Sequence, residues 1–142
     1  MQMQTRPILL IEDNPMDVDL TRRAFSRRRL GNHIHVLRDG QEALDYFAAW
    51  TPEDALPLVI LLDLKLPRVH GLDVLREIKE KPSLRKLPVV VLTSSAEDRD
   101  INTAYELGAN SYIVKPVDFD KFMEVASQIE IYWLAVNRPP EL

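Results

Sequence analysis

The stretch Leu58-Val59-Ile60-Leu61-Leu62-Asp63 decides the fold of this chain. Five consecutive apolar residues between Pro57 and a carboxylate are typical of a parallel β-strand that is buried on both faces. In an open sheet of such strands, ligands bind outside the carboxyl ends of the strands. Asp63 is therefore predicted to lie at the centre of a functional site.

Three other apolar runs also end in polar residues. They are residues 8–11 before Glu12 and Asp13, residues 89–92 before Thr93, and residues 112–114 before Lys115. Because the carboxyl ends of parallel strands lie at one edge of a sheet, three acids, a hydroxyl and an ammonium are expected to converge there. This combination predicts a site for a metal ion and a phosphoryl group.

Helical patterns alternate with these runs. One helix is expected to begin at Asn14-Pro15 and end near residues 27–29, and others to follow Asp39-Gly40, to span residues 72–80, to close at Leu107-Gly108 and to span residues 118–136. A short strand is expected at residues 34–37, and Ser94 with Glu97 matches a capping box. Strands that alternate with helices predict an α/β fold with a parallel sheet.

The composition fits a single domain over residues 1–142. An apolar share of 46% is ample for a core, and the last predicted helix leaves no room for an effector domain. A net charge of -4 argues against nucleic acid as a direct partner, and the absence of cysteine excludes thiol chemistry and disulfides. With no signal-peptide pattern and no run of about 20 apolar residues, the protein is predicted to be cytoplasmic and without membrane contact.

The predicted chemistry follows from the charges at the strand ends. Glu12, Asp13 and Asp63 would repel one another at close range unless a cation lay between them. Carboxylate oxygens favour Mg²⁺ or Mn²⁺, and such a metal lets a carboxylate attack phosphorus and form an aspartyl phosphate. Three further groups suit the phosphoryl oxygens: the Thr93 hydroxyl, backbone N–H groups near Ser94 and the Lys115 ammonium.

Each of these residues also has an ordinary structural role when it is taken alone. Asp13 is typical of a helix start, Asp63 of a turn, Thr93 of a strand and Lys115 of a solvated surface. Four strands that all end in chemically matched residues favour the functional interpretation. The three histidines show no ligand spacing and are interpreted as surface residues: His33, His35 and His70.

On these residues the chain resembles the receiver domain of two-component response regulators, from end to end. The motifs Glu12-Asp13, Asp63, Thr93 and Lys115-Pro116 stand in register with that family. The resemblance implies a flavodoxin-like, doubly wound sheet of five parallel strands in the order 2-1-3-4-5, with five helices. It also implies a protein that accepts a phosphoryl group on Asp63 from a histidine kinase. Its own catalysis would be limited to this transfer and to slow hydrolysis.

The resemblance also assigns metal ligands. Asp13 and Asp63 would bind Mg²⁺ directly, Glu12 would act mostly through water, and the backbone carbonyl of Lys65 would be a third protein ligand. Lys65 stands where many receivers carry Asn, and His70 stands where Asp is common. These departures leave the phosphorylation residues in place, but Lys65 is expected to alter the lifetime of the phosphoryl group.

A switch is implied by the same resemblance. The bond before Pro116 would be cis, since the cis form costs little before proline. The Thr93 hydroxyl would move toward the phosphoryl group and Tyr112 would rotate inward. The surface that would change is formed by the helix ending at Leu107, the strand at residues 112–114 and the last helix.

A narrower resemblance is to the small response regulators of bacterial and cyanobacterial phytochromes. It rests on stretches outside the site, namely residues 11–15 with Asp17, residues 107–112, residues 117–119 and residues 132–134. It implies a phytochrome-type sensor kinase as the partner and a homodimer as the assembly.

The last helix gives independent support for a dimer. Its apolar residues cover more of the circumference than one core-facing stripe, which needs only somewhat more than ~100°. Ile131 falls in the middle of the polar face, and Leu134 widens the apolar side. Such apolar width is typical of a loosely covered helix end, but Tyr132 and Trp133 beside exposed aliphatic residues favour an interface. These four residues are predicted to form the surface of a two-fold homodimer.

Three other functions fit the sequence less well. A phosphatase of the haloacid dehalogenase type needs a second Asp two residues after the nucleophile, where this chain has Lys65. A flavodoxin needs hydroxyls and glycines in its first loop, where Glu12-Asp13 would repel an anion. A degenerate receiver would lack phosphorylation residues, and here they are all present. A stand-alone, phosphorylated receiver is therefore the predicted function.

Overall fold

The computed structural model describes residues 6–26, 32–51, 54 and 56–140 of the chain. Its five strands are β1 (Ile8–Ile11), β2 (Ile34–Leu37), β3 (Val59–Leu62), β4 (Val89–Thr93) and β5 (Ser111–Val114). They form one parallel sheet in the order β2-β1-β3-β4-β5, which confirms the predicted topology. The three inner strands are buried on both faces, as their unbroken apolar sequences require.

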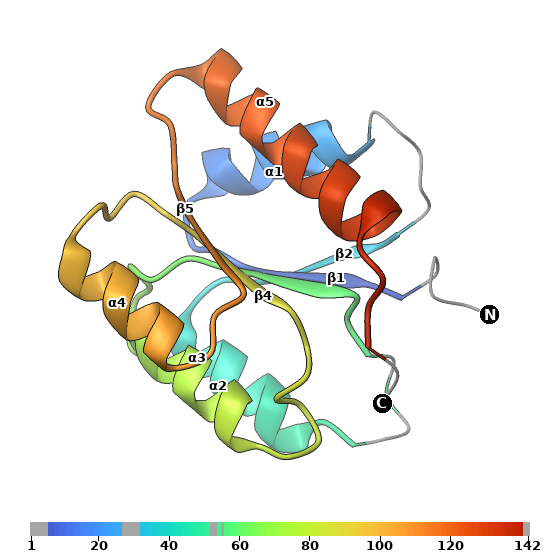
Figure 1. Ribbon diagram of the computed structural model, residues 1–142, viewed down its shortest axis with the longest axis vertical. Helices are drawn as coiled ribbons and strands as arrows, with labels where there is room; N and C mark the ends of the chain where they lie inside the picture. The colour runs from blue at the N-terminus through green and yellow to red at the C-terminus, as the bar shows by residue number, and fades with distance from the viewer. Residues whose placement is uncertain (1–5, 27–31, 52–53, 55, 141–142) are drawn as a thin grey trace.

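Five α-helices cover the sheet. They are α1 (Pro15–Ser26), α2 (Gly40–Ala49), α3 (Gly71–Glu80), α4 (Asp98–Glu106) and α5 (Phe119–Glu130). α1 and α5 lie on one face of the sheet, and α2, α3 and α4 lie on the other (Figure 1). The expected end of the first helix near residues 27–29 lies outside the described residues.

Two apolar cores result from this arrangement, one on each face. Alternate strand residues point to opposite faces, so that Leu9 and Ile60 join the core beneath α2, α3 and α4, while Leu10 and Leu61 join the core beneath α1 and α5. All four side chains are at most 3% exposed. The sheet is therefore a rigid frame whose strand ends are held by packing on both sides.

The register of the strands brings their carboxyl ends together. Ile11 of β1 lies opposite Leu62 of β3, and Thr93 of β4 lies opposite Val114 of β5. The residues that follow β1, β3 and β5 therefore meet at one edge of the sheet, as the sequence predicts.

The start of α1 is capped as the sequence predicts, whereas the start of α4 is not. The Asn14 side chain accepts hydrogen bonds from the N–H groups of Met16 (2.9 Å) and Asp17 (3.2 Å), which caps α1. The predicted capping box of Ser94 and Glu97 is wrong. Glu97 is itself the residue before α4 and makes no side-chain cap bond.

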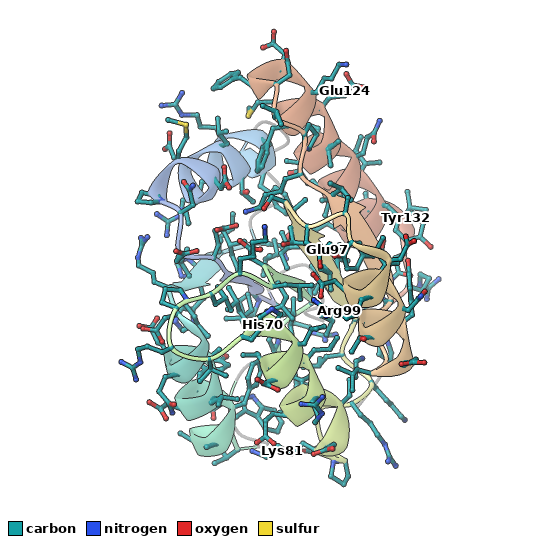
Figure 2. All side chains as sticks on the ribbon, turned by 90° about the vertical axis from the view of Figure 1, so that its left-hand side faces the viewer. His70, Lys81, Glu97, Arg99, Glu124 and Tyr132 are labelled. Atoms are coloured by element: carbon teal, nitrogen blue, oxygen red, sulfur yellow. The ribbon has the colours of Figure 1, made fainter. Side chains whose placement is uncertain are left out.

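A π-helical turn, η2 (Ile131–Val136), continues α5. Its wider winding is marked by the hydrogen bond from Asn137 N–H to the carbonyl of Tyr132, five residues earlier (2.6 Å). Tyr132 projects outward and is 50% exposed (Figure 2), whereas Trp133 and Leu134 pack partly against the α1/α5 core. Within the described part of the chain, none of the helices has the length and apolar character needed to cross a bilayer.

Candidate functional site

Six of the predicted site residues line one hollow at the carboxyl edge of the sheet: Glu12, Asp13, Asp63, Lys65, Ser94 and Lys115. Its volume is about 430 Å³, and its walls are Glu12, Asp13, Asn14, Pro15, Asp17, Asp63, Lys65, Ser94 and Lys115. Glu12, Asp63 and Ser94 follow the buried strands β1, β3 and β4, which hold their backbones in place.

Asp63 lies at the floor of this hollow. Its side chain is 6% exposed, and its backbone N–H donates to the carbonyl of Ile11 (3.0 Å). Oδ1 accepts a hydrogen bond from the backbone N–H of Lys65 (3.2 Å), and Oδ2 accepts one from Nζ of Lys115 (3.0 Å). The Thr93 hydroxyl also donates to this carboxylate. Asp63 therefore has a fixed position and a charge-stabilising set of donors.

Gly71 fixes the backbone at Asp63 because no side chain fits between them. A Cβ atom at Gly71 would lie 2.3 Å from the carbonyl oxygen of Asp63 and 2.5 Å from Cα of Leu64. The N–H of Gly71 donates to the carbonyl of Leu64 (2.8 Å). The start of α3 thus rests directly on the end of β3.

Three carboxylates form the expected acidic group. One oxygen each from Glu12, Asp13 and Asp63 lies within 4.8 Å of the others. Glu12 is buried and its Oε2 accepts a hydrogen bond from the N–H of Asn14 (3.1 Å), while Asp13 is open to solvent. Oxygen donors gathered in this way fit a hard divalent cation.

The Lys115 ammonium lies among carboxylates. Nζ is 2.7 Å from Oε1 of Glu12, 2.8 Å from Oδ2 of Asp17 and 3.0 Å from Oδ2 of Asp63. Its side chain is only 9% exposed. The predicted lysine is therefore in the site, and Asp17 is a fourth acid that the sequence analysis did not assign to it.

Asp63 and Lys115 stabilise one another in their charged forms. Burial opposes ionisation of Asp63, but the Lys115 charge and hydrogen bonds from Thr93, Lys115 and Lys65 outweigh it, so the pKa of Asp63 is lowered. Burial also opposes the charge of Lys115. The carboxylate of Glu12 and the hydrogen bonds to Asp17 and Glu12 outweigh that burial, and the pKa of Lys115 is raised. Asp63 is therefore ionised at neutral pH.

The crowding of the acids changes the pKa of Glu12. Burial and the negative charge of Asp63 raise the pKa of Glu12 to about 7, against the attraction of Lys115. Glu12 and Asp63 share one ammonium, and the more buried glutamate is the acid that protonates first.

A second set of contacts links the site to β5. The N–H of Ser95 donates to Oγ1 of Thr93 (3.5 Å), and the Tyr112 hydroxyl donates to the carbonyl of Ser95 (2.9 Å). Ser95 also donates through its own hydroxyl to Oδ2 of Asp100 on α4 (2.6 Å). Thr93 and Tyr112, predicted as switch residues, are thus connected through Ser95, which the sequence analysis missed.

The structure contradicts the predicted cis bond before Pro116. The described part of the chain has no cis peptide bond, so Lys115–Pro116 is trans. Because the two isomers of a bond to proline differ by only ~0.5–1 kcal/mol, the sequence does not decide between them.

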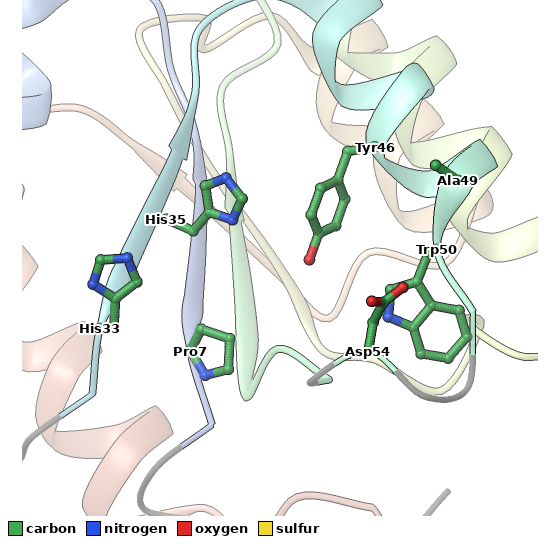
Figure 3. A pocket seen from close by; sticks show the side chains of 7 residues that line it. All are labelled: Pro7, His33, His35, Tyr46, Ala49, Trp50 and Asp54. Carbon is green, nitrogen blue, oxygen red and sulfur yellow. The ribbon is translucent and has the colours of Figure 1, made fainter.

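The histidines lie outside this site. His33 and His35 are exposed and line a separate hollow of about 420 Å³ with Pro7, Tyr46, Ala49, Trp50 and Asp54 (Figure 3). The His35 ring meets the Tyr46 ring edge-on at 5.4 Å. Across the described residues, no histidine belongs to a group of three metal-ligating side chains. The interpretation of His33, His35 and His70 as surface residues therefore agrees with the structure.

Comparison with known proteins gives a consistent family. The profile of the response regulator receiver domain matches residues 8–127. A relative, the probable methanogenesis regulatory protein FilR2 of Methanothrix harundinacea, is 45% identical over 134 residues, which cover 94% of this chain and 86% of FilR2.

Three solved structures are similar over 96% of this chain. The phosphorylated cyanobacterial phytochrome response regulator RcpA is 35% identical with a TM-score of 0.91, and 99% of its chain is covered. The Mn²⁺-bound response regulator Rcp1 is 34% identical with a TM-score of 0.90 and 99% coverage. The bacteriophytochrome response regulator AtBRR is 45% identical with a TM-score of 0.71 and 97% coverage.

Proposed function

This chain belongs to the response regulator receiver family, and we propose that it is a signalling switch that accepts a phosphoryl group on Asp63 from a histidine kinase. One observation carries the proposal. Asp63 is a buried carboxylate, kept ionised by Lys115, in a hollow that is lined by three further acids. A buried, ionised and accessible carboxylate is suited to act as a nucleophile.

The proposed reaction transfers the phosphoryl group from a phosphohistidine. An oxygen of Asp63 forms the new O–P bond while the P–N bond of the donor breaks, and the departing imidazole nitrogen keeps the electron pair and takes up a proton. Lys115 and the Thr93 hydroxyl already contact the Asp63 carboxylate. They are therefore placed to bind oxygens of the transferred group. Hydrolysis of the acyl phosphate by water returns the protein to its starting state.

The proposed cofactor is Mg²⁺, with Mn²⁺ as an alternative. Asp13 and Asp63 would hold it directly, Glu12 through water, and Lys65 through its backbone carbonyl. The gathered carboxylate oxygens fit such an ion, and the Mn²⁺-bound form of Rcp1 supports this class of metal. When bound, the ion offsets the negative charge of the acids and of the incoming phosphoryl group.

The test is phosphorylation by acetyl phosphate with Mg²⁺, followed by intact-mass measurement. The wild type is expected to gain one phosphoryl group, and Asp63→Asn none. Asp73→Asn is the matched control, because Asp73 is an exposed acid on α3 that pairs with Arg76 at 2.7 Å. Full labelling of the Asp63→Asn protein would overturn the assignment.

The proposed output is a change at α4, β5 and α5. For Tyr112 to rotate inward, its hydroxyl must leave the carbonyl of Ser95, and movement of Thr93 toward the phosphoryl group pulls on the same residue. Structures with and without a phosphoryl mimic test this step. If Thr93 and Tyr112 occupy the same positions in both, the switch lies elsewhere.

The proposed partner is a phytochrome-type sensor kinase in the cytoplasm. The similarity to RcpA and AtBRR supports it. FilR2 is as identical to this chain as AtBRR is, at 45%, and is named a probable methanogenesis regulatory protein. Phosphotransfer from a purified phytochrome kinase, compared with an unrelated histidine kinase at equal concentration, tests the choice. Equal rates from both kinases would contradict it.

We also propose a homodimer through η2 and its neighbours. Ile131 is 37% exposed and Tyr132 50% exposed. Tyr132 and Trp133 line a groove of about 490 Å³ between β5 and α5. Because Leu134 packs partly against the core, the sharper test replaces the two exposed residues. Sedimentation of Ile131→Glu, Tyr132→Glu against the wild type at micromolar concentration should show the loss of a dimer. A monomeric wild type, phosphorylated or not, would refute it.

A further inference from the structure

Asp17 contacts the site without belonging to its metal-binding group. Lys115 Nζ has three N–H donors, and three carboxylates lie within 3.0 Å of it: Glu12, Asp17 and Asp63. Glu12 and Asp63 share the acidic group with Asp13, whereas Asp17 is not a member of it. Lys115 is thus shared between acids that can hold a cation and one acid on the side of α1.

The position of Asp17 is fixed by α1 and is separate from the metal group. Its N–H donates to Oδ1 of Asn14 (3.2 Å), and its carbonyl accepts the hydroxyl of Thr21 (2.8 Å). Both bonds use the backbone of Asp17, so its side chain is left to bind Lys115, which is 98 residues away in sequence. Its side chain is 20% exposed, more than that of Glu12 or Asp63.

A cation at the acidic group competes with Lys115 for two carboxylates. Glu12 and Asp63 cannot give their full negative charge to a metal while both also bind an ammonium at 2.7 Å and 3.0 Å. A lysine side chain that is 9% exposed needs a charged partner when those bonds weaken, because an unpaired buried charge is costly. Asp17 is such a partner, and it lies at 2.8 Å.

We propose that Asp17 is a positioning residue that retains Lys115 when a divalent cation enters, and so makes room for that cation. This inference rests on the proposed function, because it concerns the Mg²⁺ of that same site. Without Asp17, Lys115 binds Glu12 and Asp63 alone and competes more strongly with the cation. Loss of this one charged contact is expected to weaken Mg²⁺ binding about tenfold, the lower end of what a hydrogen bond to a charged group contributes.

A simple electrostatic effect would look similar in a single variant. Asp17 carries a negative charge near the site, and removing it would weaken Mg²⁺ binding even if Lys115 played no part. The two explanations differ when Lys115 is absent. Positioning through Lys115 then has nothing to act on, whereas direct attraction between Asp17 and the cation remains.

The experiment is a double-mutant cycle on Mg²⁺ affinity. The four proteins are the wild type, Asp17→Asn, Lys115→Met and the double variant, with Mg²⁺ titrated by calorimetry. Asp17→Asn should weaken binding about tenfold with Lys115 present and less than about twofold in the Lys115→Met background. Asp19→Asn is the matched control on the same helix, since Asp19 pairs with Arg23 at 3.0 Å on the surface. It should change the affinity by less than about twofold.

Two further readings separate positioning from loss of structure. Phosphorylation of Asp17→Asn by acetyl phosphate should need about tenfold more Mg²⁺ for half the maximal rate, with that maximal rate retained. Asp17→Glu, which restores the charge, should recover part of the affinity. An equal loss of affinity in both Lys115 backgrounds, or no loss in either, would overturn the inference. If the wild type itself binds no Mg²⁺, the proposed function fails instead.

Discussion

Replacing Lys115 by Met tests whether the ammonium stabilises the resting site. Three carboxylates surround Nζ at 2.7, 2.8 and 3.0 Å, and the side chains of Glu12 and Asp63 are 4% and 6% exposed. Met keeps the length of the lysine stem and removes its charge. The acids of the variant would then repel one another with no cation between them, and the folded state should lose stability.

The expected loss of stability depends on the burial of the ion pairs and on the protonation of Glu12. Removing one partner of a buried ion pair costs about 3–5 kcal/mol. Protonation of Glu12 limits this cost, because its pKa is already about 7 with Lys115 in place and the loss of the ammonium raises it further. We expect the free energy of unfolding to fall by about 3 kcal/mol at pH 8 and by less at pH 6, where Glu12 is protonated.

The assay is urea unfolding followed by circular dichroism, with EDTA and then with Mg²⁺. A ligand at 100 times its Kd stabilises the folded state by about 2.7 kcal/mol, so saturating Mg²⁺ should recover most of the deficit of the variant. Lys121→Met, which removes an exposed lysine from α5, should change stability by less than about 0.5 kcal/mol. If Lys115→Met in EDTA at pH 8 is as stable as the wild type, the charge argument is wrong.

Three further predictions concern single residues. Folding raises the pKa of Glu12 to about 7, so the stability that Glu12 contributes is full below about pH 4.5 and is lost as the pH rises through 7. In EDTA, Glu12→Gln should therefore flatten the fall in unfolding free energy between pH 5 and 8. Arg68 has φ of 70°, a left-handed conformation that costs about 1–2 kcal/mol outside glycine, so Arg68→Gly should raise the urea midpoint, and an unchanged or lower midpoint would contradict the strain. Lys65 is exposed and lines the hollow, where its charge should hinder the attack of water on the phosphoryl group. Lys65→Asn is expected to shorten the lifetime of the phosphorylated state by no more than about fivefold. Equal hydrolysis rates in the two proteins would leave Lys65 without a role.

The fold and the main site residues could be predicted because both depend on local sequence. Buried parallel strands appear as unbroken apolar runs, and the residue after each run is placed at the sheet edge by topology alone. Glu12, Asp63, Thr93 and Lys115 are all assigned in this way, and the structure brings them into contact. The metal, the phosphoryl transfer and the individual roles remain predictions.

The sequence could not reveal contacts that depend on how elements pack. Asp17 sits in the first turn of α1, where an acid is favoured by the helix dipole, and nothing local signals that Lys115 will reach it. Ser95 carries no motif of its own, whereas its neighbour Ser94 matches a capping box with Glu97. The π-helical winding of η2 is also not visible in the sequence, which predicts one continuous helix over residues 118–136.

Charge balance explains why a lysine, rather than an apolar residue, lies among these acids. Four carboxylates surround the hollow, and Lys115 neutralises only part of their charge, so the resting site stays negative enough to attract a divalent cation. A phosphoryl group on Asp63 would bring further negative charge to the same place. The cation and Lys115 can then share it, because neither needs to leave the site. The contact with Asp17 is what makes this sharing possible, since it gives Lys115 a charged partner at every stage.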